Sequence, residues 1–134
     1  MTAEVVVLVE DDPDDAFLTT HTLVRHGLKH EIVVVGDGRA ALELLLPPPP
    51  IERVRAALVL LDLNLPHIGG FEVLRRLRAD PQTADVPVIL FTSTSTDEQR
   101  LMRLQPAVAF LRKPLNCSSF QSVTARIGLH LGLD

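Results

Sequence analysis

The sequence predicts an α/β fold in which a doubly wound, five-stranded parallel sheet is covered by five helices. Five short apolar runs, rich in β-branched residues, have the composition of strands that are buried on both faces. Stretches with helical spacing separate these runs, and strict alternation of strands and helices requires parallel pairing with right-handed crossovers. The expected strands are Val5–Val9, Ile32–Val35, Ala57–Leu61, Val88–Phe91 and Val108–Leu111.

Helix starts are marked by residues whose side chains cap the first backbone N–H groups of a helix. The expected caps are Asp12, Asp37, Thr96 and Asn116, and Thr96 forms a capping box with Gln99. The first helix should begin at Pro13 and stop at Gly27, and the second should cover Arg39–Leu46, before four prolines. Two apolar stripes indicate the third and fifth helices: Phe71, Leu74 and Leu77, and then Phe120, Val123, Ile127 and Leu131.

The 134 residues are expected to form a single domain, residues 1–134, which is long enough to bury a substantial core. The one cysteine, Cys117, offers no disulfide framework and suits a reducing cytoplasm. No apolar run is long enough for a membrane span, and the early acidic residues argue against a secretory signal. A net charge of −4, scattered basic residues and the absence of Trp and Tyr argue against a nucleic-acid partner.

The residues at the carboxyl ends of the expected strands differ sharply from the strands themselves. The first strand ends in Glu10 and Asp11, the third in Asp62, the fourth in Thr92 and the fifth in Lys113. In a sheet of this kind, ligands bind outside the carboxyl ends of the strands. Four separate segments should therefore bring carboxylates, a hydroxyl and an ammonium group to one edge of the sheet.

This set of groups is suited to phosphoryl chemistry. Clustered carboxylates repel one another unless a cation neutralises them, and their oxygens are ligands that Mg²⁺ accepts. Asp62 would then be the nucleophile that forms an acyl phosphate. The metal and Lys113 would offset the charge on the oxygens of the transferred group.

Structural interpretations of the same residues stand beside the functional ones. Asp12, Asp14 and Asp15 fit the start of a helix, where acidic side chains interact favourably with the helix dipole; a share in the metal site is the alternative. Glu10 and Asp11 could be merely solvated, but acids that end a buried apolar strand favour a function. Thr92 could simply end a strand, Lys113 could be a surface lysine, and Phe110 could be a residue of the core.

Five motifs in a fixed order resemble the receiver domains of two-component response regulators. They are Val9-Glu10-Asp11; Asp37-Gly38 with Ala41-Leu42; Leu61-Asp62-Leu63-Asn64-Leu65-Pro66, with Gly70 eight residues after Asp62; Pro87–Thr92; and Phe110-Leu111-Arg112-Lys113-Pro114. The resemblance covers roughly residues 4–131 and implies a flavodoxin-like, CheY-like sheet with strand order 2-1-3-4-5. The acidic start at residues 10–15 and the segment after Asp62 look most like the small stand-alone regulators that are paired with phytochrome-type kinases.

The resemblance implies how the metal and the phosphoryl group would be held. Asp62 would accept the phosphoryl group. Asp11 and Asp62 would ligate Mg²⁺, with Glu10 acting directly or through water and Asn64 contributing its backbone carbonyl.

It also implies how phosphorylation would be sensed and removed. Thr92 and Lys113 would contact phosphoryl oxygens, and Phe110 would be a switch that moves inward when Thr92 shifts. Asn64 and Thr94 would control the access of the water that hydrolyses the acyl phosphate. One departure, Gln105-Pro106-Ala107 in place of the usual Gly-Ala before the switch aromatic, leaves the geometry of the output face open.

The implied partners are a sensor histidine kinase or a histidine phosphotransfer protein, of the phytochrome-associated type, and an unknown downstream protein. The domain would catalyse only its own phosphorylation and dephosphorylation, and it would signal without an output domain because the chain ends just after the fifth helix. A homodimer is compatible with such a receiver, although no residue specifies it.

Two other classes of function fit less well. A phosphohydrolase or phosphotransferase with an aspartyl nucleophile usually carries a second acid two residues later, where Asn64 stands. A pseudo-receiver scaffold that binds partners without phosphorylation would not need the acidic, hydroxyl and lysine residues at the strand ends.

Overall fold

The computed structural model describes residues 4–93, 109–129 and 131 of the chain. Within this part, five parallel strands form one sheet in the order β2-β1-β3-β4-β5. The strands are β1 (Val5–Val9), β2 (Ile32–Val35), β3 (Ala56–Leu61), β4 (Val88–Thr92) and β5 (Ala109–Arg112). The predicted fold class and strand order are confirmed. β3 and β4 each differ from the expected bounds by one residue at one end, and β5 is shifted by one residue at both ends.

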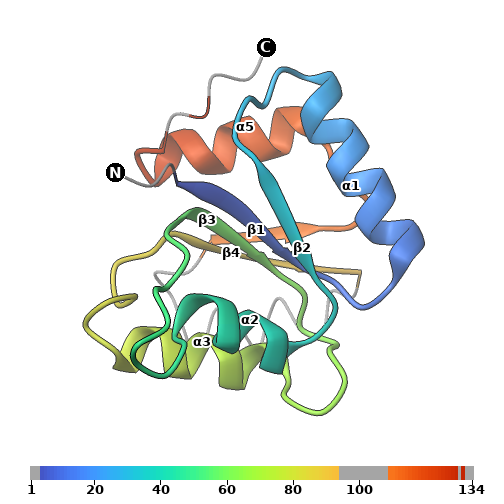
Figure 1. Cartoon of the computed structure of the whole chain (residues 1–134). Coiled ribbons are helices and arrows are strands. Elements are labelled where there is room, and N and C mark those ends of the chain that lie inside the picture. The colour runs from blue at the N-terminus through green and yellow to red at the C-terminus, as the bar shows by residue number, and fades with distance from the viewer. Residues whose placement is uncertain (1–3, 94–108, 130, 132–134) are drawn as a thin grey trace.

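Helices cover both faces of the sheet (Figure 1). Helices α1 (Pro13–Arg25) and α5 (Cys117–Arg126) lie on one face, and α2 (Gly38–Leu45) and α3 (Gly70–Ala79) lie on the other. The fourth helix that Thr96 and Gln99 predict falls within residues 94–108, outside the described residues.

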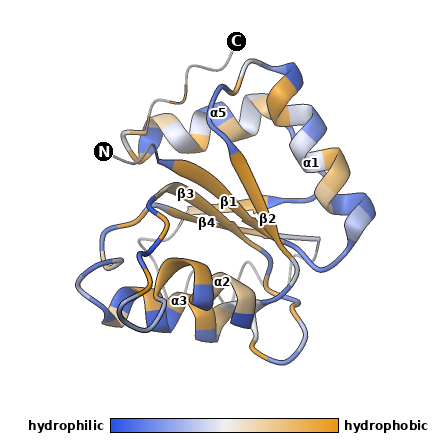
Figure 2. Ribbon diagram, viewed as in Figure 1, coloured by the Kyte–Doolittle hydropathy of each residue, from blue (hydrophilic) through white to orange (hydrophobic). Residues whose placement is uncertain are grey.

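The core consists of two apolar layers, one on each side of the sheet. Alternate strand residues supply them, because successive side chains of a strand point to opposite faces. Val7, Val59 and Leu90 contribute to the layer under α2 and α3, and Leu8, Leu60 and Ile89 to the layer under α1 and α5. Figure 2 shows the strands as the most hydrophobic elements. Full burial of one such side chain stabilises the fold by about 1.5–3 kcal/mol, more than the ~1 kcal/mol of a helix cap, so strand packing dominates.

The predicted caps of three helices are confirmed by hydrogen bonds. Asp12 accepts from the amides of Asp14 and Asp15, Asp37 from Ala40, and Asn116 from Ser119. Helix α1 ends at Arg25, and Gly27 then takes a φ of 100°, which favours glycine and turns the chain away from the helix.

The apolar stripe predicted for the last helix is only partly correct. Phe120 and Val123 are buried as expected. Ile127 is wrong as a core residue, since α5 ends at Arg126 and Ile127 is 38% exposed. Gly128 follows with a φ of 76°, which breaks the helical register, and Leu131 is buried from outside the helix.

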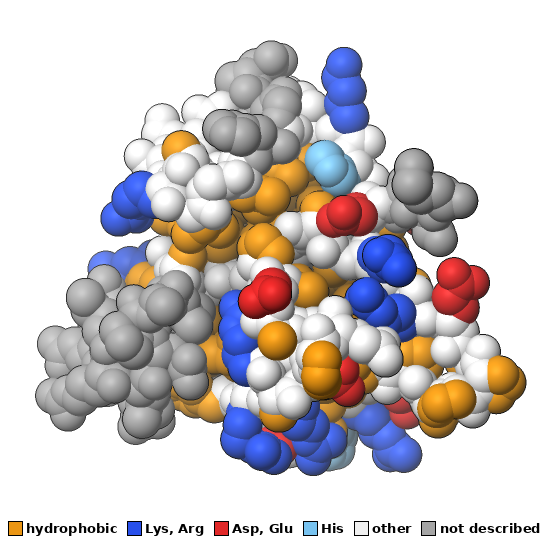
Figure 3. All heavy atoms as spheres, turned by 90° about the vertical axis from the view of Figure 1, so that its left-hand side faces the viewer, with side chains coloured by type: hydrophobic (Ala, Val, Ile, Leu, Met, Phe, Trp, Pro, Cys, Tyr) orange, Lys and Arg blue, Asp and Glu red, His pale blue; other side chains and the backbone are white. Residues whose placement is uncertain are grey.

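Figure 3 shows the side of the molecule where β1 begins. In this view, Lys and Arg side chains gather along the edge formed by α2 and α3 (Figure 3). Among the described helices, none is long and apolar enough to cross a membrane.

Candidate functional site

The candidate site lies just beyond the carboxyl ends of the strands, and the sheet fixes its backbone. The amide of Glu10 donates to the carbonyl of Val35 at 2.9 Å, that of Asp62 to Val9 at 3.1 Å, and that of Lys113 to Thr92 at 2.8 Å. These bonds extend the ladders of β1, β3 and β5 by one step each. The three side chains therefore leave from positions that the rigid sheet sets, which is how a precise site is held in place.

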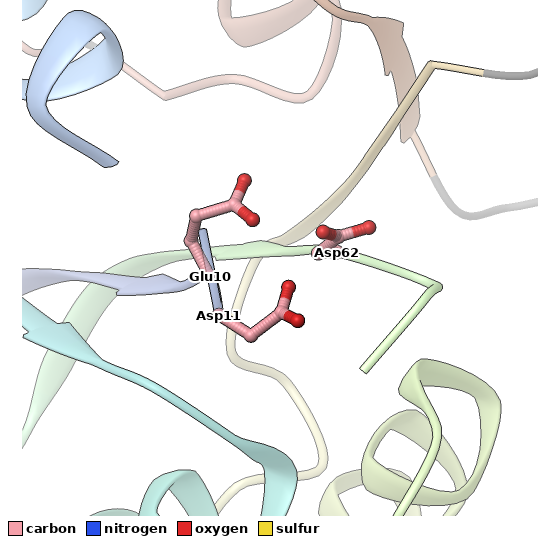
Figure 4. Close-up of side chains that lie close together, drawn as sticks. All are labelled: Glu10, Asp11 and Asp62. Atoms are coloured by element: carbon pink, nitrogen blue, oxygen red, sulfur yellow. The ribbon is translucent and has the colours of Figure 1, made fainter. Parts of the chain in front are cut away.

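Three carboxylates converge at this edge. Glu10, Asp11 and Asp62 each offer an oxygen, and these oxygens all lie within 4.8 Å of one another. Figure 4 shows the three carboxylates directed toward a common space. Glu10 and Asp62 are only 3% and 4% exposed, whereas Asp11 is exposed at the rim. Such a set of oxygen ligands, open on one side, fits a divalent cation that keeps some of its water.

Lys113 joins this group from the end of β5, the edge strand of the sheet. Its ammonium donates to Glu10 Oε1, to Asp62 Oδ2 at 3.0 Å and to Asp15 Oδ2 at 3.3 Å. The same nitrogen lies 5.6 Å from the centre of the buried Phe91 ring. Burial opposes the charged form, but the hydrogen bonds to Glu10 and Asp62 raise the pKa of Lys113 above its ordinary value. Lys113 therefore stays cationic beside Asp62.

The electrostatics of Glu10 differ from those of Lys113. Burial raises the pKa of Glu10 to about 7, against the lowering effects of the hydrogen bonds from Lys113 and from the amide of Asp12. The negative charge of Asp62 pushes the pKa in the same direction as burial. The site is thus short of positive charge, and a cation between the carboxylates would favour their ionised forms.

The loop after Asp62 wraps closely around it. The amide of Asn64 donates to Asp62 Oδ1 at 3.0 Å, and the amide of Gly70 donates to the carbonyl of Leu63 at 3.2 Å. A Cβ on Gly70 would lie 2.4 Å from the carbonyl oxygen of Asp62. Glycine is therefore required at position 70, because α3 begins in direct contact with the backbone of Asp62 and Leu63.

Two other predicted residues, Thr92 and Phe110, lie on β4 and β5. Thr92 is fully buried at the end of β4, and the β4–β5 register places Phe110 opposite Leu90. Phe110 packs against the apolar layer under α2 and α3 and does not belong to the carboxylate group. Thr94 and the segment Gln105-Pro106-Ala107 lie outside the described residues.

For Asp15, the sequence did not decide between a helix-start role and a share in the site. Asp12 has the helix-start role expected of it, but Asp15 pairs with Lys113, which is 98 residues away. A signal was present in the spacing: once Asp12 caps α1, Asp15, Thr19 and Thr22 follow at helical intervals on one face. These three residues line the same pocket as Lys113.

The family described as "Response regulator receiver domain" matches residues 6–124. The response regulator Rcp1 of Synechocystis sp. (strain ATCC 27184 / PCC 6803 / Kazusa) is 34% identical over 96 residues, which is 71% of this chain and 65% of that protein.

Solved structures are similar over nearly the whole chain. The bacteriophytochrome response regulator AtBRR has a TM-score of 0.88 at 31% identity, with 100% of this chain and 99% of that chain covered. The Mn²⁺-bound form of response regulator Rcp1 has a TM-score of 0.75 at 30% identity, covering 97% and 96%. The phosphorylated cyanobacterial phytochrome response regulator RcpA has a TM-score of 0.76 at 30% identity, covering 98% and 96%.

Proposed function

Since the chain belongs to the family of response-regulator receiver domains, we propose that Asp62 accepts a phosphoryl group and that the phosphorylated domain signals by a change of shape. One observation carries the proposal. The buried Asp62 carboxylate lies 3.0 Å from the Lys113 ammonium, and one of its oxygens lies within 4.8 Å of carboxylate oxygens of Glu10 and Asp11. A nucleophile, a fixed positive charge and a cation site are the parts that phosphoryl transfer needs.

Mg²⁺ is the proposed cation. Glu10, Asp11 and Asp62 would hold it through carboxylate oxygens, and Asn64 through its backbone carbonyl. The set consists of oxygens alone, which suits a hard cation, and the exposed side of Asp11 leaves room for water. When bound, Mg²⁺ supplies charge that offsets the phosphoryl oxygens. The Mn²⁺-bound form of Rcp1, whose fold this chain shares, supports a divalent cation here.

The proposed step is a displacement at phosphorus. An oxygen of Asp62 forms the O–P bond while the P–N bond to a donor histidine breaks, and the imidazole nitrogen keeps that electron pair. Lys113 offsets charge on one phosphoryl oxygen, and the hydroxyl of Thr92 donates to another. Phe110 lies on the neighbouring strand, two residues before Arg112, which is the register partner of Thr92. Phe110 then moves inward when Thr92 shifts.

The protein is a signalling domain, and the only reactions that we propose for it are its own phosphorylation and dephosphorylation. Receiver domains interact with histidine kinases or phosphotransfer proteins, and the likeness to AtBRR and RcpA supports a donor of the phytochrome-associated type. The donor must reach a buried carboxylate, so it must contact the rim of the site. Leu18 of α1, which is 55% exposed, lines the same pocket as Asp15 and offers the donor an apolar contact there.

Phosphorylation should require a divalent cation. Incubation of the chain with Mg²⁺ and a small acyl-phosphate donor is expected to add one phosphoryl group, because the carboxylate cluster cannot admit a further anion without a cation. Intact mass spectrometry measures the adduct, and the same incubation with a chelator is the control. Equal adduct formation in the presence of chelator would contradict the proposed cation site.

Cation affinity should rise with pH. The raised pKa of Glu10, about 7, means that this carboxyl is protonated below that pH. Only the ionised form is a ligand, so Mg²⁺ must displace a proton at pH 6 but not at pH 8. We expect affinity to increase about tenfold between these values. Calorimetry in two buffers with different ionisation enthalpies measures both the affinity and the released proton. A Glu10→Gln variant should lose this pH dependence, and an equally flat profile in the wild type would contradict the account of Glu10.

A further inference from the structure

Asp15 makes a contact that the proposed chemistry does not use. It is the third residue of α1, and its Oδ2 accepts from the Lys113 ammonium at 3.3 Å, across the gap between α1 and the segment that follows β5. The Asp15 side chain is 43% exposed, whereas that of Lys113 is 13% exposed. The pair therefore closes the rim of the site on the α1 side.

The contact is particular to Asp15 among the acids at the start of α1. Asp12 is turned back onto its own helix, where it accepts from the amides of Asp14 and Asp15 at 2.8 Å and 3.2 Å. Asp14 is exposed. Within the described residues, the ion pairs of Lys113 run to Glu10, Asp15 and Asp62.

The three acceptors of Lys113 are not equivalent once a cation enters the site. An ammonium group has three N–H donors, and three carboxylates take them up. Glu10 and Asp62 belong to the carboxylate cluster that could hold a metal ion, but Asp15 does not. The ammonium and the cation therefore compete for Glu10 and Asp62, and two positive charges at one cluster repel each other.

There is space for Lys113 to turn toward Asp15. A pocket of about 110 Å³ lies between α1 and the start of the β5–α5 connection, and its lining includes Asp15, Thr19, Phe91 and Lys113. The Phe91 ring lies beneath the lysine nitrogen and favours a cation there. An ammonium that releases Glu10 can thus stay paired and desolvated on the α1 side.

We propose that Asp15 is a positioning residue, which holds the Lys113 ammonium on the α1 side of the site and so leaves Glu10 and Asp62 to the divalent cation. This inference rests on the proposed function, because it requires a cation at the carboxylate cluster. The further element is that the Lys113 ammonium and the divalent cation share the carboxylate cluster. Asp15, which lies outside the cluster, determines which carboxylates remain for the divalent cation.

A double-mutant cycle on Mg²⁺ affinity tests the inference. The Kd for Mg²⁺ is measured by calorimetry at pH 8 for the wild type, Asp15→Asn, Lys113→Gln and the double variant. Without its third acceptor, Lys113 should remain on Glu10 and Asp62, so Asp15→Asn should weaken Mg²⁺ binding about fourfold. In the Lys113→Gln background, the same change should weaken binding by less than about 1.5-fold, through lost charge alone.

Asp14→Asn is the matched control. It removes the same charge from the same turn of α1 without touching Lys113, and its effect should be equally small in both backgrounds. A second readout follows the lysine itself by ¹⁵N NMR of its ammonium group. With Mg²⁺ bound, the Lys113 ammonium signal should persist in the wild type and in Asp14→Asn, and should be lost to fast hydrogen exchange in Asp15→Asn.

The outcomes separate this inference from the proposed function. The same loss for Asp15→Asn in both backgrounds, tighter binding in Asp15→Asn, or an unchanged Lys113 signal contradicts the positioning role and leaves the cation site standing. Absence of Mg²⁺ binding in the wild type contradicts both.

Discussion

Replacement of Asp62 by Asn is expected to abolish the phosphoryl adduct that the wild-type chain forms with Mg²⁺ and an acyl-phosphate donor. An amide oxygen is a poor nucleophile toward phosphorus, and the change also removes one of the three carboxylates at the cation site. The fold should survive, because Asn is nearly isosteric and can still accept from the amide of Asn64. Intact mass spectrometry measures the adduct, and thermal unfolding checks the fold.

Asp80→Asn provides a control with the same change of chemical group. Asp80 caps the end of α3 and accepts from the amide of Gln82 at 2.8 Å, outside the carboxylate cluster. This variant should form the adduct as the wild type does. An undiminished adduct on Asp62→Asn would mean that another side chain is the acceptor.

Gly70→Ala should have the largest effect on stability. The new Cβ would lie 2.4 Å from the carbonyl oxygen of Asp62 and 2.8 Å from the Cα of Leu63, and both are backbone atoms. They cannot easily retreat, because the Asp62 amide is bonded to Val9 in the sheet and Leu63 is buried. We expect the free energy of unfolding to fall by about 3 kcal/mol, as overpacking against backbone costs at least as much as overpacking among side chains. Urea unfolding followed by circular dichroism measures the loss.

Gly69→Ala is the matched control for this substitution. It lies one residue earlier, has a φ of −70° that any residue adopts, and has no atom within 4 Å of its added Cβ. Its effect should stay within about 0.5 kcal/mol. Similar losses for the two variants would show that the close approach of α3 to Asp62 does not require glycine.

The strands and most helix starts could be predicted because each depends on local sequence. A strand buried on both faces needs an unbroken apolar run, and Val5–Val9 and Ala56–Leu61 have that composition. A cap is a bond between residues two or three apart, so Asp12, Asp37 and Asn116 could be assigned from their neighbours.

One error concerns a local turn, and one open question concerns a contact with a distant part of the chain. Ile127 continues the helical spacing of Phe120 and Val123, but the positive φ of Gly128 ends that register, and the turn leaves Ile127 exposed. The partner of Asp15 could not be chosen from sequence, since helix-start acids usually face water and the contact to Lys113 joins residues 98 apart. Local patterns located the carboxylates, but only the packing of α1 against the β5–α5 connection gave Lys113 its third partner.

Reductive trapping identifies the side chain that carries the phosphoryl group, which we propose is Asp62. Borohydride reduces an aspartyl phosphate to homoserine, so the wild-type chain is treated with Mg²⁺ and an acyl-phosphate donor, reduced, and mapped by peptide mass spectrometry. We expect conversion at position 62 alone, and none when a chelator replaces Mg²⁺. Conversion at Asp11 or another acidic residue, or a phosphoryl adduct on a chain whose Asp62 stays unmodified, would contradict it.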